Sequence, residues 1–333
     1  MNEKTVALLH QLVDQKIVPG VSYAMIYQDD VQTEVFGNKQ LVPALKPLED
    51  GALYDLASLT KVIGTTTVIL QLLEAKKLRL DDRVAKYLPR FSDQRVTLRH
   101  LLTHTSALSG YIKNRDQLPP TELMAALYTL KPAAWLGKKV VYADIGLILL
   151  GQIIEVFYHR PVQAVIMTEV LRPLGMKNST FAPPKKQCVP TELTATRGLI
   201  QGEVHDPKAF ILGKHCGSAG LFSNLADLIK FAKWMLAPQT IPGILAPETV
   251  VMLYADHTPT HDLGRSLGWD LRYDQSNTPC LYHTGFTGTF MLLDQKGKNA
   301  LIVLTNRVHP RVDNEAFLEW RDKIVATYLA EKD

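Results

Sequence analysis

The β-rich runs of this chain lie near its two ends, and a long helical region separates them. Six such runs stand out, at residues 21–27, 31–36, 267–271, 280–283, 289–294 and 300–305. The first two are joined by the short polar stretch 28–30, which is typical of a hairpin. The simplest assembly pairs early and late strands in one antiparallel sheet and segregates the helices from it. The sequence therefore predicts an α+β fold.

Helical patterns fill most of the remaining sequence. Apolar residues recur at helical spacing near both termini, as Val6, Leu9, Leu12 and Val13 and as Phe317, Trp320, Ile324, Val325 and Tyr328. These two amphipathic helices would flank the sheet, and the helical region between the strands would form an inserted lobe. We therefore expect one unit, residues 1–333, with an α/β lobe of approximately 1–56 and 215–333 and a mainly helical lobe of approximately 57–214.

The composition limits the partners that we expect. Charged residues make up 21% of the chain, the net charge is +4, and no basic run is longer than a pair, so we expect no nucleic-acid partner. No apolar run reaches membrane-spanning length and the N-terminus lacks signal-peptide features, which predicts a cytoplasmic protein without a membrane partner. Cys188, Cys216 and Cys280 have no metal-type spacing, so we expect reduced thiols and neither metal nor cofactor.

One short stretch carries a possible nucleophile and its base. Ser58 and Lys61 stand three residues apart, where a small and polar run meets the apolar, helix-compatible segment 62–73. If Ser58 opens this helix, Lys61 lies one turn further on the same face. A serine hydroxyl needs a base to take its proton, and a partly buried lysine with a lowered pKa can be that base. A serine N-cap followed by an exposed lysine fits the same pattern, so the pair alone decides nothing.

Two further stretches place polar residues at the boundaries of predicted elements. Tyr142 and Asp144 come just before a strongly apolar helix at 145–157, where Asp144 also suits a helix cap. His283, Thr284 and Gly285 lie between two β-rich runs, where a strand end with a glycine turn is the simpler interpretation.

Taken together, these stretches form an ordered set of motifs: Ser58 with Lys61, then Tyr142 with Asp144, then His283-Thr284-Gly285. The set resembles the serine β-lactamase and penicillin-binding protein superfamily, in particular its class C β-lactamase-like, family VIII esterase-like branch. Further similar stretches lie at 80–82, 87–89, 101–106, 174–176 and 220–223, and the resemblance spans roughly residues 15–305. It implies a β-lactamase-like fold with the active site between the two lobes. It also implies a serine hydrolase, whose partner is a small-molecule ester, amide or β-lactam.

The resemblance implies a role for each of the catalytic residues. Ser58 would attack a carbonyl carbon and form an acyl-enzyme, and Lys61, with its pKa lowered by burial and by a protonated His283, would take or relay the proton. Tyr142 would share the relay and activate water in deacylation. The oxyanion would be held by the backbone N–H groups of Ser58 and of Phe286, which is expected on an edge strand.

The supporting residues include two departures from the family pattern. Gly285 would avoid crowding the substrate, and Thr284 would bind a substrate carboxylate or the relay. Asp144 stands where asparagine is usual, and a carboxylate only accepts hydrogen bonds. His283 stands where lysine is usual, and histidine is mostly neutral at pH 7. Both departures weaken anion recognition, so we rank ester or amide hydrolysis above efficient β-lactam hydrolysis.

Other polar groups have simpler interpretations. Ser218 stands in a sequence similar to a nucleophile elbow, but Cys216 occupies the first glycine position, which favours a wall of the cleft. His257 and His261 lack a third metal ligand, and His104 is expected to cap a helix end. Two other functions stay open: a D-alanyl-D-alanine peptidase or penicillin-binding protein, and a binding protein of this fold that has lost turnover.

Overall fold

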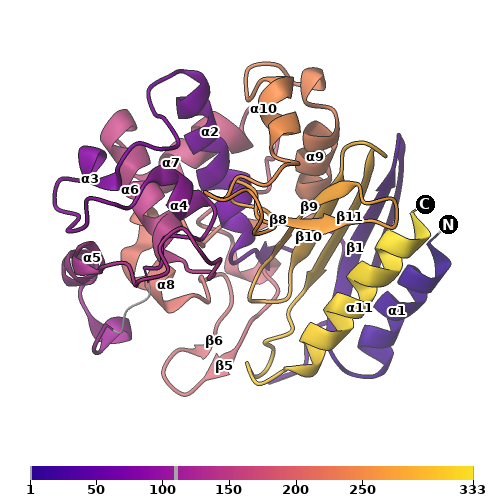
Figure 1. Ribbon diagram of the computed structural model, residues 1–333. Helices are drawn as coiled ribbons and strands as arrows, with labels where there is room; N and C mark the ends of the chain where they lie inside the picture. Colours follow the sequence, from indigo (N-terminus) through magenta and orange to yellow (C-terminus); the bar gives the residue numbers. More distant parts are fainter. Residues whose placement is uncertain (1, 109–111, 333) are drawn as a thin grey trace.

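A seven-stranded antiparallel sheet is the scaffold of the computed structural model, which describes residues 2–108 and 112–332 (Figure 1). The strand order is β3-β2-β1-β11-β10-β9-β8. The bounds are β1 Gly20–Tyr27, β2 Asp30–Gln40, β3 Lys46–Pro47, β8 Asp270–Tyr273, β9 Pro279–Thr284, β10 Phe290–Asp294 and β11 Asn299–Thr305. β1 lies beside β11, with Val21 opposite Thr305, which confirms the predicted pairing of early and late strands.

Two terminal helices cover one face of this sheet. α1 (Glu3–Asp14) and α11 (Ala316–Glu331) lie side by side, with both chain ends on that side of the molecule (Figure 1). Their apolar faces share one core with alternate residues of the strands, for example Leu9 and Ile324 with Val303. The helical spacing at the two termini therefore predicted both the helices and their position on the sheet.

The opposite face of the sheet packs against the helical part of the chain. α9 (Leu225–Leu236) lies directly on β1, β10 and β11, and its buried side chains include Phe231 and Trp234. The remaining α-helices are α2 Thr67–Glu74, α3 Val84–Tyr87, α4 Leu98–Leu102, α5 Pro120–Thr129, α6 Ile145–Tyr158, α7 Val162–Ile166, α8 Pro207–Leu212 and α10 Pro247–Met252. Single π-helical turns precede α2 (η1, Lys61–Thr66) and follow α7 (η3, Met167–Leu171).

The shorter elements join the larger ones. The 3₁₀ turns are η2 Arg115–Gln117, η4 Lys185–Gln187, η5 Gly213–His215 and η6 Pro238–Thr240. Two small ladders pair β4 (Tyr54–Asp55) with β7 (Phe222–Ser223) and β5 (Leu193–Thr194) with β6 (Gly198–Leu199). The β4–β7 ladder matters for the site, because it fixes the backbone just before Ser58.

α6 is the central helix of the helical part, and its composition explains why. Most of its residues are apolar, so it is buried around nearly its whole circumference. A Cβ at Gly146 would lie 2.9 Å from the carbonyl oxygen of Leu101, so α4 approaches α6 closely at this glycine. This packing places the residues just before α6, Tyr142 to Asp144, against the end of α4.

One local prediction was wrong, and one short helix was not predicted. The strand expected at 267–271 begins only at Asp270, because Gly268 has a φ of +80° and the Ser266 N–H donates to the Trp269 carbonyl, which closes a turn. α8 had no clear signal in the sequence; its first turn is capped by Asp206, which accepts from the Ala209 N–H at 2.8 Å. Six helical residues are too few to establish a period in the sequence.

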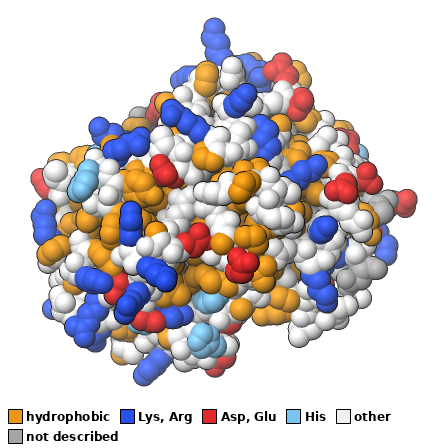
Figure 2. All heavy atoms as spheres, turned by 90° about the horizontal axis from the view of Figure 1, so that it is seen from above, with side chains coloured by type: hydrophobic (Ala, Val, Ile, Leu, Met, Phe, Trp, Pro, Cys, Tyr) orange, Lys and Arg blue, Asp and Glu red, His pale blue; other side chains and the backbone are white. Residues whose placement is uncertain are grey.

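The surface seen in Figure 2 mixes charged and apolar side chains. Among the described residues on this face, Lys and Arg are interspersed with Asp, Glu and apolar groups, and no continuous basic surface forms there. Within the described ranges, no single helix is both long and apolar enough to cross a membrane.

Candidate active site

A strained turn presents Ser58 at the start of a helix. Ala57, just before it, has a φ of 45°, a conformation that costs a non-glycine residue energy. The buried carboxylate of Asp55 supports this turn by accepting the Ala57 N–H at 2.9 Å and the His205 N–H at 2.7 Å. The helix then continues as the π-turn η1, which begins at Lys61. The Asp55 carboxylate therefore stabilises the strained backbone that holds the half-buried Ser58 in place.

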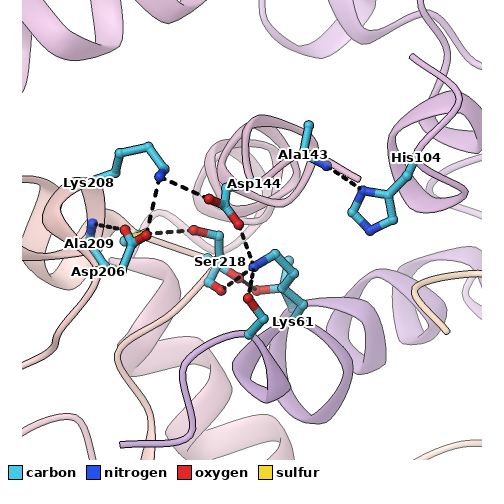
Figure 3. A network of polar contacts seen from close by, with 12 residues as sticks. Lys61, His104, Ala143, Asp144, Asp206, Lys208, Ala209 and Ser218 are labelled. Atoms are coloured by element: carbon cyan, nitrogen blue, oxygen red, sulfur yellow. Dashed lines mark hydrogen bonds and ion pairs between the residues drawn. The ribbon is translucent and has the colours of Figure 1, made fainter. Parts of the chain in front are cut away.

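The ammonium group of Lys61 lies at the centre of the site. Its Nζ lies 2.7 Å from Ser58 Oγ. It also lies 2.8 Å from the Ser218 carbonyl oxygen and 2.8 Å from Asp144 Oδ1 (Figure 3). An ammonium has three N–H donors, so these contacts use all of them. In this arrangement Lys61 donates to Ser58 and has no lone pair with which to accept its proton.

A row of alternating charges continues from Lys61. Asp144, which immediately precedes α6, places its second oxygen 2.9 Å from Lys208 Nζ, and Lys208 also contacts Asp206 at 3.2 Å (Figure 3). Burial opposes the charge of Asp144, but Lys61 and Lys208 outweigh it and hold the pKa of this carboxyl well below its usual range. Both carboxylate oxygens are therefore occupied by cations.

The charge state of Lys61 differs from the prediction. Burial alone would lower its pKa, but the carboxylate of Asp144 outweighs burial and raises the pKa of Lys61 above its usual range. His283 does not help to lower it either, because burial, Arg265 and Lys61 hold the pKa of His283 well below its usual value. The prediction of a lowered pKa for Lys61 was therefore wrong, because it took no account of how the Asp144 carboxylate raises this pKa.

Asp144→Asn is expected to destabilise the protein by about 3 kcal/mol near neutral pH, because it leaves the buried Lys61 without its carboxylate. The folded-state pKa of Asp144 is depressed, so its contribution is present above the unfolded pKa, about 3.9, and is lost as the pH falls below that value. The stability difference between wild type and variant should therefore shrink on acidification. Urea denaturation at pH about 7 and about 3.5 measures it. The control is Asp29→Asn at an exposed position, which should leave the stability unchanged at both pH values. A stability difference between wild type and Asp144→Asn that is the same at both pH values would contradict the expectation.

Tyr142 lies between aromatic and cationic groups. Its ring stacks on His104 with centroids 4.4 Å apart and lies 5.9 Å from the His283 ring. The Nζ of Lys61 is 5.3 Å from the ring centroid, and the guanidinium of Arg265 is 5.6 Å from it. His104 was expected only to cap a helix end, but its ring stacks on Tyr142 and its Nδ1 accepts the Ala143 N–H at 3.3 Å (Figure 3).

The expected oxyanion donors have no competing acceptor. Within the described ranges, neither the Ser58 N–H nor the Phe286 N–H donates to a protein group. Arg307 holds Phe286 in place. Its Nε donates to the Phe286 carbonyl oxygen at 2.8 Å, and its guanidinium lies 4.7 Å from the centroid of the Phe286 ring. Two free N–H groups flank the cavity, as an oxyanion hole requires.

Two details of this third motif differ from the prediction. β9, which carries His283 and Thr284, is not the edge strand of the sheet, because β8 pairs with it and forms the edge. The β8–β9 ladder ends at Asp270 opposite Tyr282, just before the motif. A Cβ at Gly285 would clash with the Thr289 side chain and lie 2.5 Å from the carbonyl oxygen of Leu56. Close packing on the backbone before Ser58 is a reason for this glycine that the sequence did not reveal.

These groups open onto one cavity of about 390 Å³. Its lining includes Ser58, Tyr142, Asp144, His205, Lys208 and Phe286. His283 and Thr284 do not line it, and His283 is buried behind Tyr142. The sequence did not single out His205, Lys208 or Arg115, which also line it, because none of them belongs to a recognisable motif.

The remaining candidates of the sequence lie elsewhere or play a backbone role. Ser218 is fully buried, its hydroxyl contacts the Cys216 sulfur at 3.3 Å, and its carbonyl oxygen accepts from Lys61. Ser218 itself does not line the cavity, whereas the next residue, Ala219, does. Among the residues that the structure describes, no group of three or more His, Cys, Asp or Glu side chains could hold a metal ion.

The sequence matches the family model described as beta-lactamase over residues 6–323. The chain belongs to the β-lactamase family. A relative in Escherichia coli (strain K12), assigned by its name to the D-alanyl-D-alanine carboxypeptidases, is 31% identical over 332 residues, which cover 84% of this chain and 75% of that protein. The family consists of hydrolases of the serine β-lactamase type, and this family member is a hydrolase of that type.

Solved structures confirm the predicted β-lactamase-like fold for this family member. A class C β-lactamase has a TM-score of 0.81 and 19% identity, with 100% of this chain and 96% of that chain covered. EstCE1, a hydrolase with promiscuous acyltransferase activity, has a TM-score of 0.77 and 20% identity, with 97% of each chain covered. At these identities the two neighbours establish the fold, and substrates must be argued from the site.

Proposed function

We propose that this protein hydrolyses small-molecule esters or amides through a Ser58 acyl-enzyme, in a site between the two predicted lobes. The observation that carries the proposal is the contact of 2.7 Å between Ser58 Oγ and Lys61 Nζ at the wall of an open cavity. A serine whose hydroxyl touches a buried cation, beside free backbone N–H groups, has the parts of a covalent hydrolase.

The contacts favour Tyr142 as the group that takes the serine proton. Lys61 is protonated and uses all three N–H donors, so in this state it stabilises negative charge on Ser58 Oγ rather than acting as base. Tyr142 lines the same cavity as Ser58, and Lys61 and Arg265 lie near its ring. In the proposed acylation, the Ser58 proton passes to Tyr142 and then to the leaving group, while Lys61 keeps its proton.

The cavity favours a substrate that carries little charge. Its cations are already paired: Lys208 with Asp144 and Asp206, and Arg115 with Asp116 at 3.0 Å. Asp144 has no free carboxylate oxygen to accept from a substrate amide, because both oxygens contact lysines. We therefore rank uncharged acyl esters and amides above penicillins, whose carboxylate would have to displace a paired carboxylate.

The carboxypeptidase name of the 31% identical relative favours a second candidate, hydrolysis of peptides that end in D-alanyl-D-alanine. Such a substrate ends in a carboxylate, which Arg115 at the cavity could bind if it left Asp116. Release of D-alanine from a short peptide, compared with hydrolysis of p-nitrophenyl butyrate and nitrocefin, separates the candidates. Faster turnover of the peptide than of the ester would favour the second one.

A fluorophosphonate is expected to label the protein covalently, because the phosphorus reacts with an activated serine. Peptide mapping should place the adduct on Ser58 and leave the Ser218 peptide unmodified. Ser58→Ala should take up no label, and the exposed Ser276→Ala should be labelled like wild type. An unlabelled wild type that also turns over none of the three substrates would mean that the cleft binds ligands without catalysis.

A further inference from the structure

Lys208 places an ammonium group at the wall of the Ser58 cavity. Its side chain is 14% exposed and lines the same cavity as Ser58. Burial opposes its charge, but the carboxylates of Asp144 and Asp206 outweigh burial and raise the pKa of Lys208 above its usual value. Lys208 therefore keeps its proton and its positive charge beside the nucleophile.

The N–H donors of this ammonium group are not all used. An ammonium has three of them. Lys208 Nζ contacts Asp144 at 2.9 Å and Asp206 at 3.2 Å, and residues 2–108 and 112–332 provide no acceptor for the third N–H. Lys61 differs in this respect, because each of its three donors has a partner. One N–H of Lys208 is therefore available to a molecule in the cavity.

The segment that carries Lys208 is fixed to the turn that presents Ser58. The Asp55 carboxylate accepts the Ala57 N–H at 2.9 Å with one oxygen and the His205 N–H at 2.7 Å with the other. Ala57 immediately precedes the nucleophile, and His205 stands three residues before Lys208. One buried side chain thus sets the distance between the two segments. The available N–H of Lys208 is held in place relative to Ser58, as recognition of a substrate group requires.

The position of Lys208 assigns its N–H to the acyl part of a substrate. In the proposed acylation the leaving group takes a proton from Tyr142, so the leaving group must lie beside that ring. Tyr142 stacks on His104, and Figure 3 shows Lys208 on the opposite side of Asp144 from His104. The acyl group, on the other side of the scissile bond, therefore extends toward Lys208.

We propose that Lys208 is a specificity-determining residue, which donates its third N–H to a carbonyl oxygen within the acyl group of the substrate. The inference rests on the proposed function, in which Ser58 attacks the scissile carbonyl. The preferred acyl group is uncharged, because Asp144 and Asp206 already balance the two lysines in this row of charges. A ketone or an amide within the acyl chain supplies the oxygen. A plain alkanoyl chain leaves the N–H without a partner and is bound less well.

The test is a comparison of matched p-nitrophenyl esters. The 4-oxopentanoate and 5-oxohexanoate esters carry a ketone, and the pentanoate and hexanoate esters are their parents without it. Each kcat/KM is divided by the rate constant for hydrolysis of the same ester by hydroxide, which removes differences in intrinsic reactivity. Wild type should prefer at least one keto ester over its parent by about tenfold, the effect of one hydrogen bond to a charged donor.

Three variants connect this preference to Lys208. Lys208→Met keeps the length of the side chain without the donor, so the preference should disappear, whereas Lys208→Arg keeps a charged donor and should retain it. Lys214→Met, at an exposed position in the following turn η5, is the control and should keep the wild-type preference. The ratio is the readout because a merely structural role of Lys208 would change the keto ester and its parent equally.

Loss of the preference in Lys208→Met together with its retention in Lys208→Arg would support the inference. Equal turnover of keto esters and parents by wild type, or an unchanged preference in folded Lys208→Met, would overturn it. If thermal unfolding shows that Lys208→Met does not fold, the double variant Lys208→Met/Asp206→Asn decides the question. It removes one charge of each sign, and asparagine can still cap α8.

Ser58→Ala distinguishes failure of this inference from failure of the proposed function. Ester turnover that is unchanged in Ser58→Ala, or absent from wild type, overturns the proposed function and the inference with it. Turnover that depends on Ser58 but shows no preference for either keto ester overturns the role of Lys208 alone.

Discussion

Replacing Ser58 with alanine is expected to reduce kcat/KM for p-nitrophenyl butyrate by at least about 10⁴-fold, because the covalent path is lost with the nucleophile. Stability should change little, since Ser58 is half-buried and, among residues 2–108 and 112–332, its hydroxyl makes a hydrogen bond with Lys61 alone. Steady-state kinetics together with urea denaturation of the same preparations measure both quantities. The variant therefore separates chemistry from folding.

The matched control for this variant is Ser276→Ala, a serine in the exposed turn between β8 and β9. It should keep wild-type kinetics. A Ser58→Ala protein that keeps more than about a tenth of wild-type kcat/KM would remove Ser58 from the mechanism. Ser218 could not replace it easily, since its hydroxyl is fully buried against Cys216.

Sequence reasoning succeeded where a local pattern carries the information. The helices predicted near the two termini are α1 and α11, and the late β-rich runs at 280–283, 289–294 and 300–305 correspond to β9, β10 and β11. Periodicity is set by burial on one face, so it survives in a single sequence. The comparisons also confirm the family that the ordered motifs indicated.

The sequence did not reveal the groups that depend on long-range contacts. Lys208 lies on the six-residue helix α8, and Arg265 lies in a turn, so neither belongs to a periodic pattern or a motif. The charge of Lys61 was misjudged for a related reason. Burial was expected to decide it, but the contact with Asp144, from the start of a different helix, has the larger effect. Such contacts exist only once the chain has folded, and charge states follow from them.

Lys61→Met is expected to lower kcat/KM by about 10³-fold, the range typical of a lost proton-transfer or charge-stabilising group. The side chain fills a fully buried site, and methionine has a similar length without the ammonium. The variant loses the donor to Ser58 Oγ and leaves Asp144 with Lys208 as its cation. The rate of fluorophosphonate labelling should fall together with turnover, because both begin with attack by Ser58.

The control for this variant is Lys77→Met, which should behave as wild type. Lys77 is an exposed lysine just beyond the end of α2. The pH profile then decides how Lys61 acts. If Lys61 stays protonated, as its contacts indicate, Lys61→Met should still show the rising limb in its pH profile. Disappearance of that limb would instead identify Lys61 as the titrating base and would contradict the assignment of the proton to Tyr142.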